Sequence, residues 1–229
     1  MARRSLTTAM RPLHRAIQLA IICSSATALA PTKFKAVLVG DALLAGRVER
    51  STYEPVRDAA AASLGRVLLS NYEVVCAAAD GAGARDLERQ LARELSRDPP
   101  PDAAVLLAGT NDLWKRDAQR TADRIKRQYA HARSAGVNIV IGVTVPPYEL
   151  PARFPRVFDI EAGVEATRLA LNDEIRASAP ALVDLDRLCA ADPATYARPD
   201  GVHFTRDGYR ALGAEIATRL EEALRAPPK

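Results

Sequence analysis

Asp200 and His203, in the segment "RPDGVHF", have the residue types and the spacing of a general base with its orienting acid. Across a Pro-Asp-Gly turn, the carboxylate can bond one imidazole nitrogen and turn the other toward a substrate. A plain turn followed by a histidine near a helix start has the same sequence, so both interpretations stay open. His14 lies in a basic N-terminal segment and His131 on a predicted exposed helix face. His203 is therefore the candidate catalytic histidine.

Two further segments could stabilise negative charge or hold loops. Asn111 in "GTND" has a neutral amide donor suited to a developing oxyanion, although a turn asparagine can equally bond its own backbone. Gly81 in "ADGAGARDL" can offer a backbone N–H to the same oxyanion or simply permit a positive φ. We expect Asp41 and Asp112 to hold loops through bonds from side chain to backbone.

The segment "VLVGDALLAG" (37–46) has the pattern of a buried strand running into a tight turn, where α/β proteins present reactive side chains. Ala42 stands at that turn, and its methyl group cannot act as a nucleophile. Ser51 and Thr52 follow beyond the bend, and we do not expect either to replace a nucleophile there. Thr110 points away from the site if its neighbour Asn111 points in.

Five short apolar runs predict the strands that position these residues, at 34–40, 72–78, 102–109, 137–145 and 181–185. They are bounded by turn residues and mostly apolar on both faces, which is typical of buried parallel strands. Amphipathic helical patterns alternate with them, at 53–69, 84–97, 119–135, 161–178 and 206–225. Thr205 is the expected N-cap of the last helix. The alternation predicts a three-layer α/β/α sandwich with a doubly wound, parallel five-stranded sheet. Trp114 and Tyr148 are candidates for lining the mouth of the candidate site or for ordinary packing.

Four segments together resemble the motif blocks of the SGNH, or GDSL-type, hydrolases. The matching positions are Gly40, Asp41 and Ala42 in "GDALLAG", Gly81 in "DGAGARDL", Gly109, Asn111 and Asp112 in "GTND", and Asp200 and His203 in "DGVH". The first block departs from the family pattern, because Ala42 stands where the family has its nucleophilic serine.

The resemblance implies a flavodoxin-like sandwich that hydrolyses carboxylic esters without a metal or an organic cofactor. His203 would be the general base and Asp200 its orienter. The backbone N–H groups of Ala42 and Gly81, with the Asn111 side chain, would form the oxyanion hole. Substrates of the family include acyl lipids, acetylated sugars, and small acyl esters and thioesters. No acyl-enzyme can form on a methyl group, so the double-displacement mechanism lacks its nucleophile at Ala42.

Three functional interpretations follow from the alanine. The chain is a pseudoenzyme that binds an ester, glycan or lipid ligand, or a slow hydrolase in which His203 activates water directly. Alternatively, Ala42 is a variant or a sequence error, since one base change converts Ser to Ala, and the natural protein is an ordinary esterase. The sequence favours ester-hydrolase ancestry with a disabled nucleophile and leaves the substrate open.

The 229 residues, 48% of them hydrophobic, suffice for one core and one domain. Four of the 32 basic residues lie in the first 30, which contain no acid, so the remaining 28 balance the 28 acidic residues. A neutral body lacks the basic footprint of nucleic-acid binding. Cys76 and Cys189 are expected as buried thiols, with a disulfide as the alternative, and no spacing suggests zinc. We expect a monomer.

Residues 1–30 have the character of a targeting peptide, and the predicted SGNH-hydrolase-like domain spans residues 33–226. The first half is basic, a short apolar run follows, and "ATALA" offers small residues for cleavage. The apolar run is too short to span a bilayer. We expect a secretory signal, leading to secretion or to a plastid through a two-part presequence, with an organelle transit peptide as the alternative.

Overall fold

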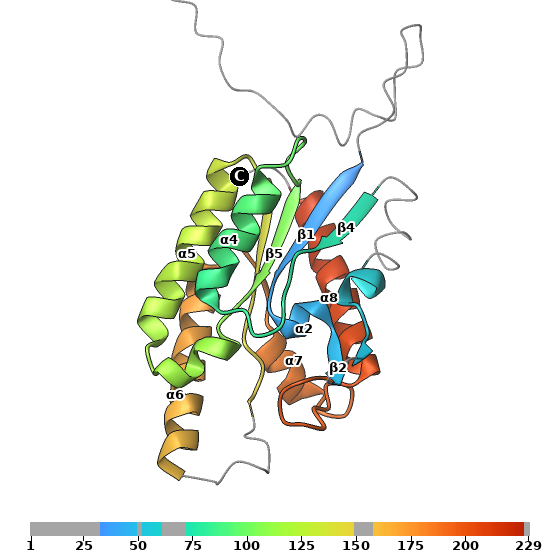
Figure 1. The fold of residues 1–229 in the computed structure, drawn as a ribbon. Coiled ribbons are helices and arrows are strands. Elements are labelled where there is room, and N and C mark those ends of the chain that lie inside the picture. Colours follow the sequence, from blue (N-terminus) through green and yellow to red (C-terminus); the bar gives the residue numbers. More distant parts are fainter. Residues whose placement is uncertain (1–32, 50–51, 61–71, 149–157, 227–229) are drawn as a thin grey trace, which may run out of the picture.

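The computed structural model of the chain describes residues 33–49, 52–60, 72–148 and 158–226. Its centre is a parallel sheet of five strands in the order β4-β1-β5-β6-β7 (Figure 1). The strands are β1 (Phe34–Gly40), β4 (Tyr72–Cys76), β5 (Ala103–Leu107), β6 (Ile139–Val143) and β7 (Ala181–Val183). This is the doubly wound order of flavodoxin-like folds. The predicted fold class, a three-layer sandwich around a parallel five-stranded sheet, is confirmed.

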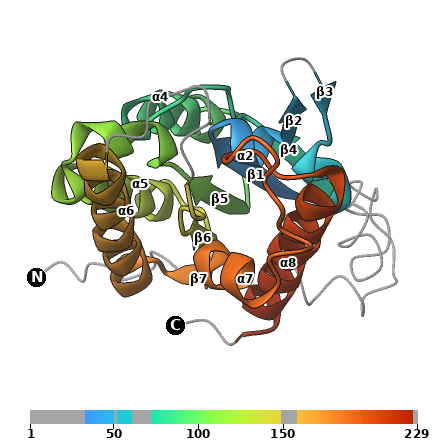
Figure 2. The same cartoon turned by 90° about the horizontal axis from the view of Figure 1, so that it is seen from below.

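Helices cover both faces of the sheet. They are α2 (Ala42–Ala45), α4 (Ala84–Leu95), α5 (Ala118–Ser134), α6 (Phe158–Ser178), α7 (Leu185–Ala191) and α8 (Arg206–Arg225), with a 3₁₀ helix η2 (Thr110–Lys115). Alternate residues of β1 enter two separate apolar cores, because successive side chains of a strand point to opposite faces. Val37 and Val39 pack with α4, α5 and α6, whereas Ala36 and Leu38 pack with α2 and α8. Figure 2 shows the two helical layers on either side of the sheet.

The structure corrects the ends of several predicted elements. Leu185, predicted in the last strand, begins α7 instead, because the Asp184 side chain accepts a hydrogen bond from the Arg187 N–H and caps a helix there. A two-stranded hairpin of β2 (Arg47–Glu49) and β3 (Thr52–Tyr53) was not predicted. Of the predicted helix at 53–69, residues 56–60 are helical and 61–69 lie outside the described residues. Thr205 caps α8 as predicted.

The carboxyl ends of β1 and β5 lie side by side, where the strand order reverses. The chain leaves β1 for β4 on one side and returns from β4 to β5 on the other, so ligands of this fold type bind in the crevice between these ends. Gly40 pairs with Leu107 at this point, and a Cβ on Gly40 would lie 2.2 Å from the Leu107 carbonyl oxygen. Glycine is therefore required for the approach of the two strands.

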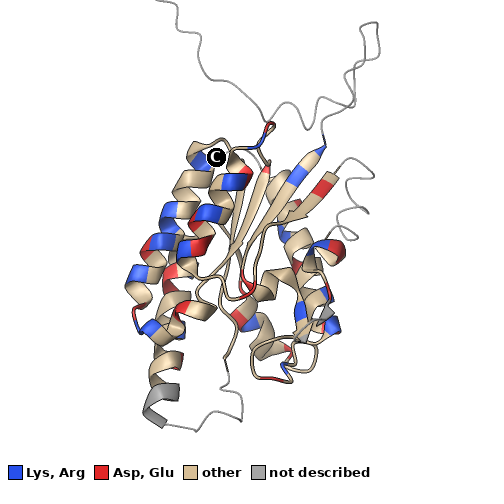
Figure 3. Cartoon of the chain, in the orientation of Figure 1, with Lys and Arg blue, Asp and Glu red and all other residues tan. Residues whose placement is uncertain are grey.

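Charged residues of both signs are interspersed along the helices, while the strands are largely uncharged (Figure 3). The described helices include none that is both long and apolar enough to cross a membrane.

Candidate active site

Asp41 and Ala42 follow β1 directly. The Asp41 side chain accepts a hydrogen bond from the Leu43 N–H at 3.0 Å and so caps the short helix α2, which confirms its expected loop-holding role. Ala42 is the first residue of α2, and 7% of its surface is exposed. Its N–H, like the others in a first helical turn, has no carbonyl partner within the helix. The predicted nucleophile position is thus a methyl group at a strand end, with a backbone donor beside it.

The Asp41 carboxyl group is buried beneath this position. Burial raises the pKa of Asp41 to about 7, outweighing the hydrogen bonds that favour its ionised form, and the nearby charge of Asp112 adds to the increase. Asp41 Oδ2 and the Thr110 hydroxyl are both buried, and neither has a hydrogen-bond partner in good geometry among the described residues. Thr110 therefore lies inward, as expected if Asn111 faces the site.

The helix η2 carries the "GTND" block and presents three different faces. A 3₁₀ helix has three residues per turn, so side chains three positions apart lie above one another. The faces are a buried pair, Thr110 and Leu113; an exposed pair, Asn111 and Trp114; and an ion pair, Asp112 and Lys115, at 2.7 Å. Gly109 precedes η2 with φ 124°, a conformation that favours glycine.

Asn111 and Asp112 both bond the segment that follows β4. Asn111 Nδ2 donates to the Ala82 carbonyl oxygen at 3.0 Å, and Asp112 Oδ2 accepts from the Ala84 N–H at 2.7 Å. An amide nitrogen has two hydrogens, so Asn111 can still direct one donor at a ligand. These contacts bring the Asn111 amide next to the loop that contains Gly81, and they confirm the loop-holding role expected of Asp112.

Two positions in this loop require glycine, for different physical reasons. Gly81 has φ 71°, and a Cβ there would meet nothing within 4 Å, so its backbone conformation and not space requires glycine. Gly83, which sequence reasoning did not single out, is the N-cap of α4, and its Cβ would lie 2.8 Å from Asp112 Oδ2. The Asp112 carboxylate thus occupies the place where a side chain on Gly83 would be.

Asp200 and His203 form the predicted pair. His203 Nδ1 lies 2.7 Å from Asp200 Oδ2, while Asp200 Oδ1 accepts hydrogen bonds from the backbone N–H groups of Val202 at 2.9 Å and His203 at 2.7 Å. Partial burial would raise the pKa of Asp200, but these hydrogen bonds outweigh it and hold the pKa below its usual value. An ionised Asp200 fixes the proton on Nδ1, which leaves Nε2 of His203 as the basic nitrogen.

Aromatic packing anchors the loop that carries this pair. Phe204 follows His203 directly and makes edge contacts with Tyr196 and Tyr209, with ring centroids 5.7 Å and 5.5 Å apart. All three rings are buried. The Tyr209 hydroxyl in turn donates to the Arg47 carbonyl oxygen at 2.6 Å, which joins α8 to β2. His203 therefore projects from a loop whose next residue is fixed in the core.

The surroundings of Tyr209 show that several segments of the chain lie close together. Burial raises its pKa, and the negative charges of Asp41, Asp200 and Asp80 raise it further, so all three carboxylates lie within electrostatic reach of one hydroxyl. The Arg47 side chain forms an ion pair with Asp80, and the Ala79 N–H donates to the Gly40 carbonyl oxygen, so the ends of β1 and β4 lie near the start of α8, into which the Asp200 turn leads. We predict that the His203 ring and Ala42 face each other within roughly 8 Å, because a general base acts directly or through one water.

The remaining candidates have simpler places. Ser51 lies outside the described residues, and Thr52 is in β3 of the two-stranded hairpin, not at the carboxyl end of a strand of the five-stranded sheet. His131 is exposed on α5, as expected. Cys76 and Cys189 are free thiols; Cys189 is buried as expected, whereas Cys76 is only partly buried. In the part of the chain that the structure describes, no three His, Cys, Asp or Glu side chains converge as a metal site.

A buried polar network at the carboxyl end of β6 was missed by sequence reasoning. The Asn172 amide bonds both the N–H and the carbonyl oxygen of Val145 at 2.8 Å, and Arg168 Nη1 donates to the same carbonyl at 3.0 Å. Arg168 also forms an ion pair with Asp186 at 2.6 Å. Both side chains come from α6 and fix the start of the loop toward Tyr148. The only signal for Asn172 and Arg168 in the sequence is that each is a polar residue within the apolar face of a predicted helix.

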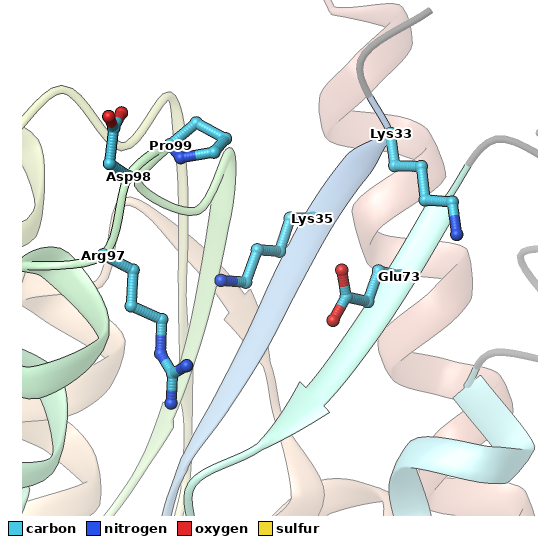
Figure 4. Close-up of a pocket in the computed structure, with 6 residues that line it drawn as sticks. All are labelled: Lys33, Lys35, Glu73, Arg97, Asp98 and Pro99. Atoms are coloured by element: carbon cyan, nitrogen blue, oxygen red, sulfur yellow. The ribbon is translucent and has the colours of Figure 1, made fainter. Parts of the chain in front are cut away.

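A surface hollow of about 490 Å³ lies at the opposite end of the strands (Figure 4). It is lined by Lys33, Lys35, Glu73, Arg97, Asp98 and Pro99. These residues lie at the amino-terminal ends of β1 and β4 and in the loop before β5, whereas the candidate site lies beyond the carboxyl ends. The hollow is therefore about 20 Å, the length of a seven-residue strand, from the Asp41–Ala42 turn.

A parallel α/β sandwich with an oriented histidine, an amide donor and a tight turn after its first strand defines a hydrolase fold of the SGNH type. The chain belongs to the GDSL-like lipase/acylhydrolase family, whose model matches residues 38–211. Ester hydrolysis is the activity of this family.

Solved structures support the fold assignment. A lipase/acylhydrolase from Enterococcus faecalis is 24% identical over 85% of this chain and 98% of its own, with a TM-score of 0.64. The psychrotrophic esterase EstA from a Pseudoalteromonas species is 13% identical over 85% of this chain and 100% of its own, with a TM-score of 0.63. The acetyl xylan esterase AlAXEase is 17% identical over 80% and 98%, with a TM-score of 0.61. No curated protein matches the chain.

Proposed function

We propose that this chain retains the ester-binding site of a GDSL-type hydrolase but has lost rapid turnover, because Ala42 stands at the nucleophile position. The observation that carries the proposal is the intact Asp200–His203 pair, with its 2.7 Å hydrogen bond, in a chain whose residue 42 is alanine and not serine. Asn111, Gly81 and the Ala42 N–H would still receive the carbonyl oxygen of a bound ester. The ligand is a carboxylic ester of a lipid, a sugar or a small alcohol.

Residual hydrolysis would take a different route from that of the family. Without a hydroxyl at residue 42 no acyl-enzyme forms, so His203 Nε2 would have to take a proton from a water molecule that attacks the ester carbonyl directly. In a serine protease, loss of the nucleophile removes about 10⁶ in turnover, while roughly 10³–10⁴ over water remains from the oxyanion hole and binding. We therefore expect trace hydrolysis at most, and the physiological role would be binding.

Restoring the hydroxyl tests the proposal. Ala42 is buried, with 7% of its surface exposed, but Ala42→Ser adds only one oxygen atom, so it should cause little overpacking. We expect the variant to hydrolyse an activated short-chain aryl ester at least ~10³-fold faster than the parent chain. Ala45→Ser, which adds a hydroxyl to the same helix three residues later, is the matched control and should remain at the parent rate.

Adding His203→Ala to Ala42→Ser should abolish the gain, because the new hydroxyl then has no base. A folded Ala42→Ser variant that cleaves neither short nor long acyl esters would show that the site has been remodelled beyond the loss of one oxygen. Rapid turnover by the parent chain would show that another group attacks the ester. Sequencing codon 42 from transcript decides whether the natural protein is instead an ordinary esterase.

A further inference from the structure

Arg47 connects three segments of the candidate site. It begins β2, five positions after Ala42. Its side chain forms an ion pair with Asp80, the residue that precedes Gly81. Its carbonyl oxygen accepts a hydrogen bond from the Tyr209 hydroxyl at 2.6 Å, which joins β2 to α8 (Figure 1). Arg47 thus contacts both the loop of one proposed oxyanion donor and the last helix.

The Gly81 N–H belongs to an exposed β-turn of type II. The Ala82 N–H donates to the Ala79 carbonyl oxygen at 3.2 Å, which closes a turn with Asp80 and Gly81 at its centre. Gly81 has φ 71°, near the value of about 80° at the third position of this turn type, and the φ of Asp80 is not positive. Both central residues are exposed, and a Cβ on Gly81 would meet nothing within 4 Å. Packing around the turn therefore does not fix the direction of this N–H.

Gly81 is held instead through its two neighbours. Glycine has the widest backbone freedom of any residue, so the direction of its N–H depends on how the adjacent residues are held. Ala82 is held by the Asn111 amide, which donates to its carbonyl oxygen at 3.0 Å. Asp80 is held by the guanidinium of Arg47. The turn is therefore tethered on both sides of the N–H donor.

The tether from Arg47 starts at a fixed point of the backbone. Gly46 caps α2 with φ 80°, and a Cβ there would lie 1.8 Å from the Glu54 carbonyl oxygen. The Glu54 N–H also donates to the Gly46 carbonyl oxygen at 2.7 Å. Together with the Tyr209 hydroxyl, these contacts hold the backbone at Arg47. A side chain that starts from a held backbone can position its partner, because only its own rotamers remain free.

The ion pair also offsets a negative charge beside the proposed oxyanion site. Asp80 is one of three carboxyl groups within electrostatic reach of the Tyr209 hydroxyl. A carboxylate next to Gly81 would oppose the negative charge that develops on the carbonyl oxygen of a reacting ester. The side chains of Arg47 and Asp80 are 25% and 31% exposed, so we expect the pair to contribute little to the free energy of unfolding. Its main effect should fall on the site.

We propose that Arg47 is a positioning residue of the oxyanion hole, where it tethers the Gly81 turn and offsets the charge of Asp80. Arg47 acts through the Gly81 N–H and not on the ester itself. The proposal rests on the proposed function in so far as this N–H receives an ester carbonyl oxygen. The tether can be measured in the full chain without any activity.

The mobility of the Gly81 N–H tests the tether. The order parameter from ¹⁵N relaxation is about 0.85 in rigid backbone and below about 0.6 in flexible backbone. We expect it to fall at Gly81 in Arg47→Met, which keeps the length of the side chain but not its charge, and to stay near the parent value in Arg47→Lys. All these variants keep the bond from the Tyr209 hydroxyl, because it uses a backbone carbonyl. Asp80→Ala removes the pair from its other side and should have the same effect as Arg47→Met.

Arg210→Met is the matched control for the loss of an ion pair. Arg210 extends from α8 and pairs with Glu54 at 2.9 Å, next to the hairpin that contains Arg47. This variant should leave the order parameter of Gly81 at the parent value. An unchanged value in both Arg47→Met and Asp80→Ala would overturn the tether, as would an equal fall in Arg210→Met.

Kinetics in the Ala42→Ser background test the effect on the reaction. We expect Arg47→Met to lower kcat for the aryl ester by about tenfold with little change in KM, because an oxyanion donor acts mainly in the transition state. This loss is smaller than the roughly 10²–10³-fold that removal of a whole oxyanion donor costs. Adding Asp80→Ala to Arg47→Met should recover part of it by removing the carboxylate that has lost its partner. No recovery would overturn the electrostatic part of the proposal.

The two proposals fail separately. If Ala42→Ser cleaves no ester while Arg47→Met still increases the mobility of Gly81, the tether stands and the proposed function is wrong. If Ala42→Ser cleaves the ester while Arg47→Met leaves kcat unchanged or changes KM alone, the ester site stands and Arg47 is not a positioning residue.

Discussion

His203 is held by a 2.7 Å hydrogen bond at Nδ1, so its other nitrogen, Nε2, is the ring atom that can exchange a proton with a ligand. The orienting Asp200 remains ionised into acidic solution, because the hydrogen bonds it accepts hold its pKa below the usual value. The pair therefore requires no change of its own to serve a nucleophile. Under the proposed function, the catalytic element that the chain lacks is one oxygen atom at residue 42.

The Asp41 carboxyl predicts a pH-dependent stability. Its pKa is raised from 3.8 to about 7 by burial, so between these values the folded chain keeps a proton that the unfolded chain releases. The free energy of unfolding should then fall as pH rises through this window, by up to about 1.4 kcal/mol per pH unit. Asp41→Asn keeps an oxygen that can cap Leu43 and removes the titrating group, so urea unfolding of the variant should show a smaller decline.

Asp117→Asn provides the control, because Asp117 caps α5 through the Arg120 N–H in an exposed position. This variant should follow the pH dependence of the parent chain. If the Asp41→Asn variant follows it too, Asp41 is already ionised throughout this range.

At the scale of the elements, the contact between η2 and the start of α4 requires that residue 83 is a glycine, without a side chain. Gly83 has φ −102°, which any residue can adopt, but a Cβ there would lie 2.8 Å from Asp112 Oδ2. Gly83→Ala should therefore displace the carboxylate from the Ala84 N–H and destabilise the protein by about 1–3 kcal/mol in urea unfolding. A double-mutant cycle checks the cause, since Gly83→Ala should cost much less once Asp112→Ala has removed the carboxylate. Additive losses would place the strain elsewhere.

The sequence predicts the elements best where one strong local pattern decides them. The strand at 34–40 has the predicted bounds, because an unbroken apolar run ends at a glycine that must approach β5. The error at Leu185 arises because the Asp184 cap gives the chain a helical path inside an apolar run. The hairpin of β2 and β3 is too short to carry any alternation. Local patterns therefore decide long elements and fail at short ones.

In the candidate site, too, some contacts could be predicted from a local pattern and others could not. The Asp200–His203 contact follows from three-residue spacing across a turn, so it could be predicted, whereas the contacts of Asn111 with Ala82 and of Asn172 with Val145 join residues nearly thirty positions apart. Such contacts depend on how η2 and α6 pack on the sheet. No local pattern specifies that packing.

At the scale of the whole molecule, distant segments are joined into one body. The Tyr209 hydroxyl bonds the Arg47 carbonyl oxygen 162 positions earlier, and β1 pairs with both β4 and β5. We expect limited proteolysis to leave one stable core of about 190–200 residues that begins near Lys33. N-terminal sequencing and mass spectrometry of the product would test this. Two separately stable halves would contradict a single domain.

The methyl group of Ala42 affects the residence time of a bound ligand as well as the chemistry of the site. In an enzyme, chemistry competes with dissociation and removes the ligand, so occupancy of the site reflects flux. Where no covalent step follows binding, we expect the ligand to leave unchanged, and its residence time is set by dissociation alone. Occupancy then follows the free ligand concentration and its Kd, which is the behaviour of a receptor or a carrier.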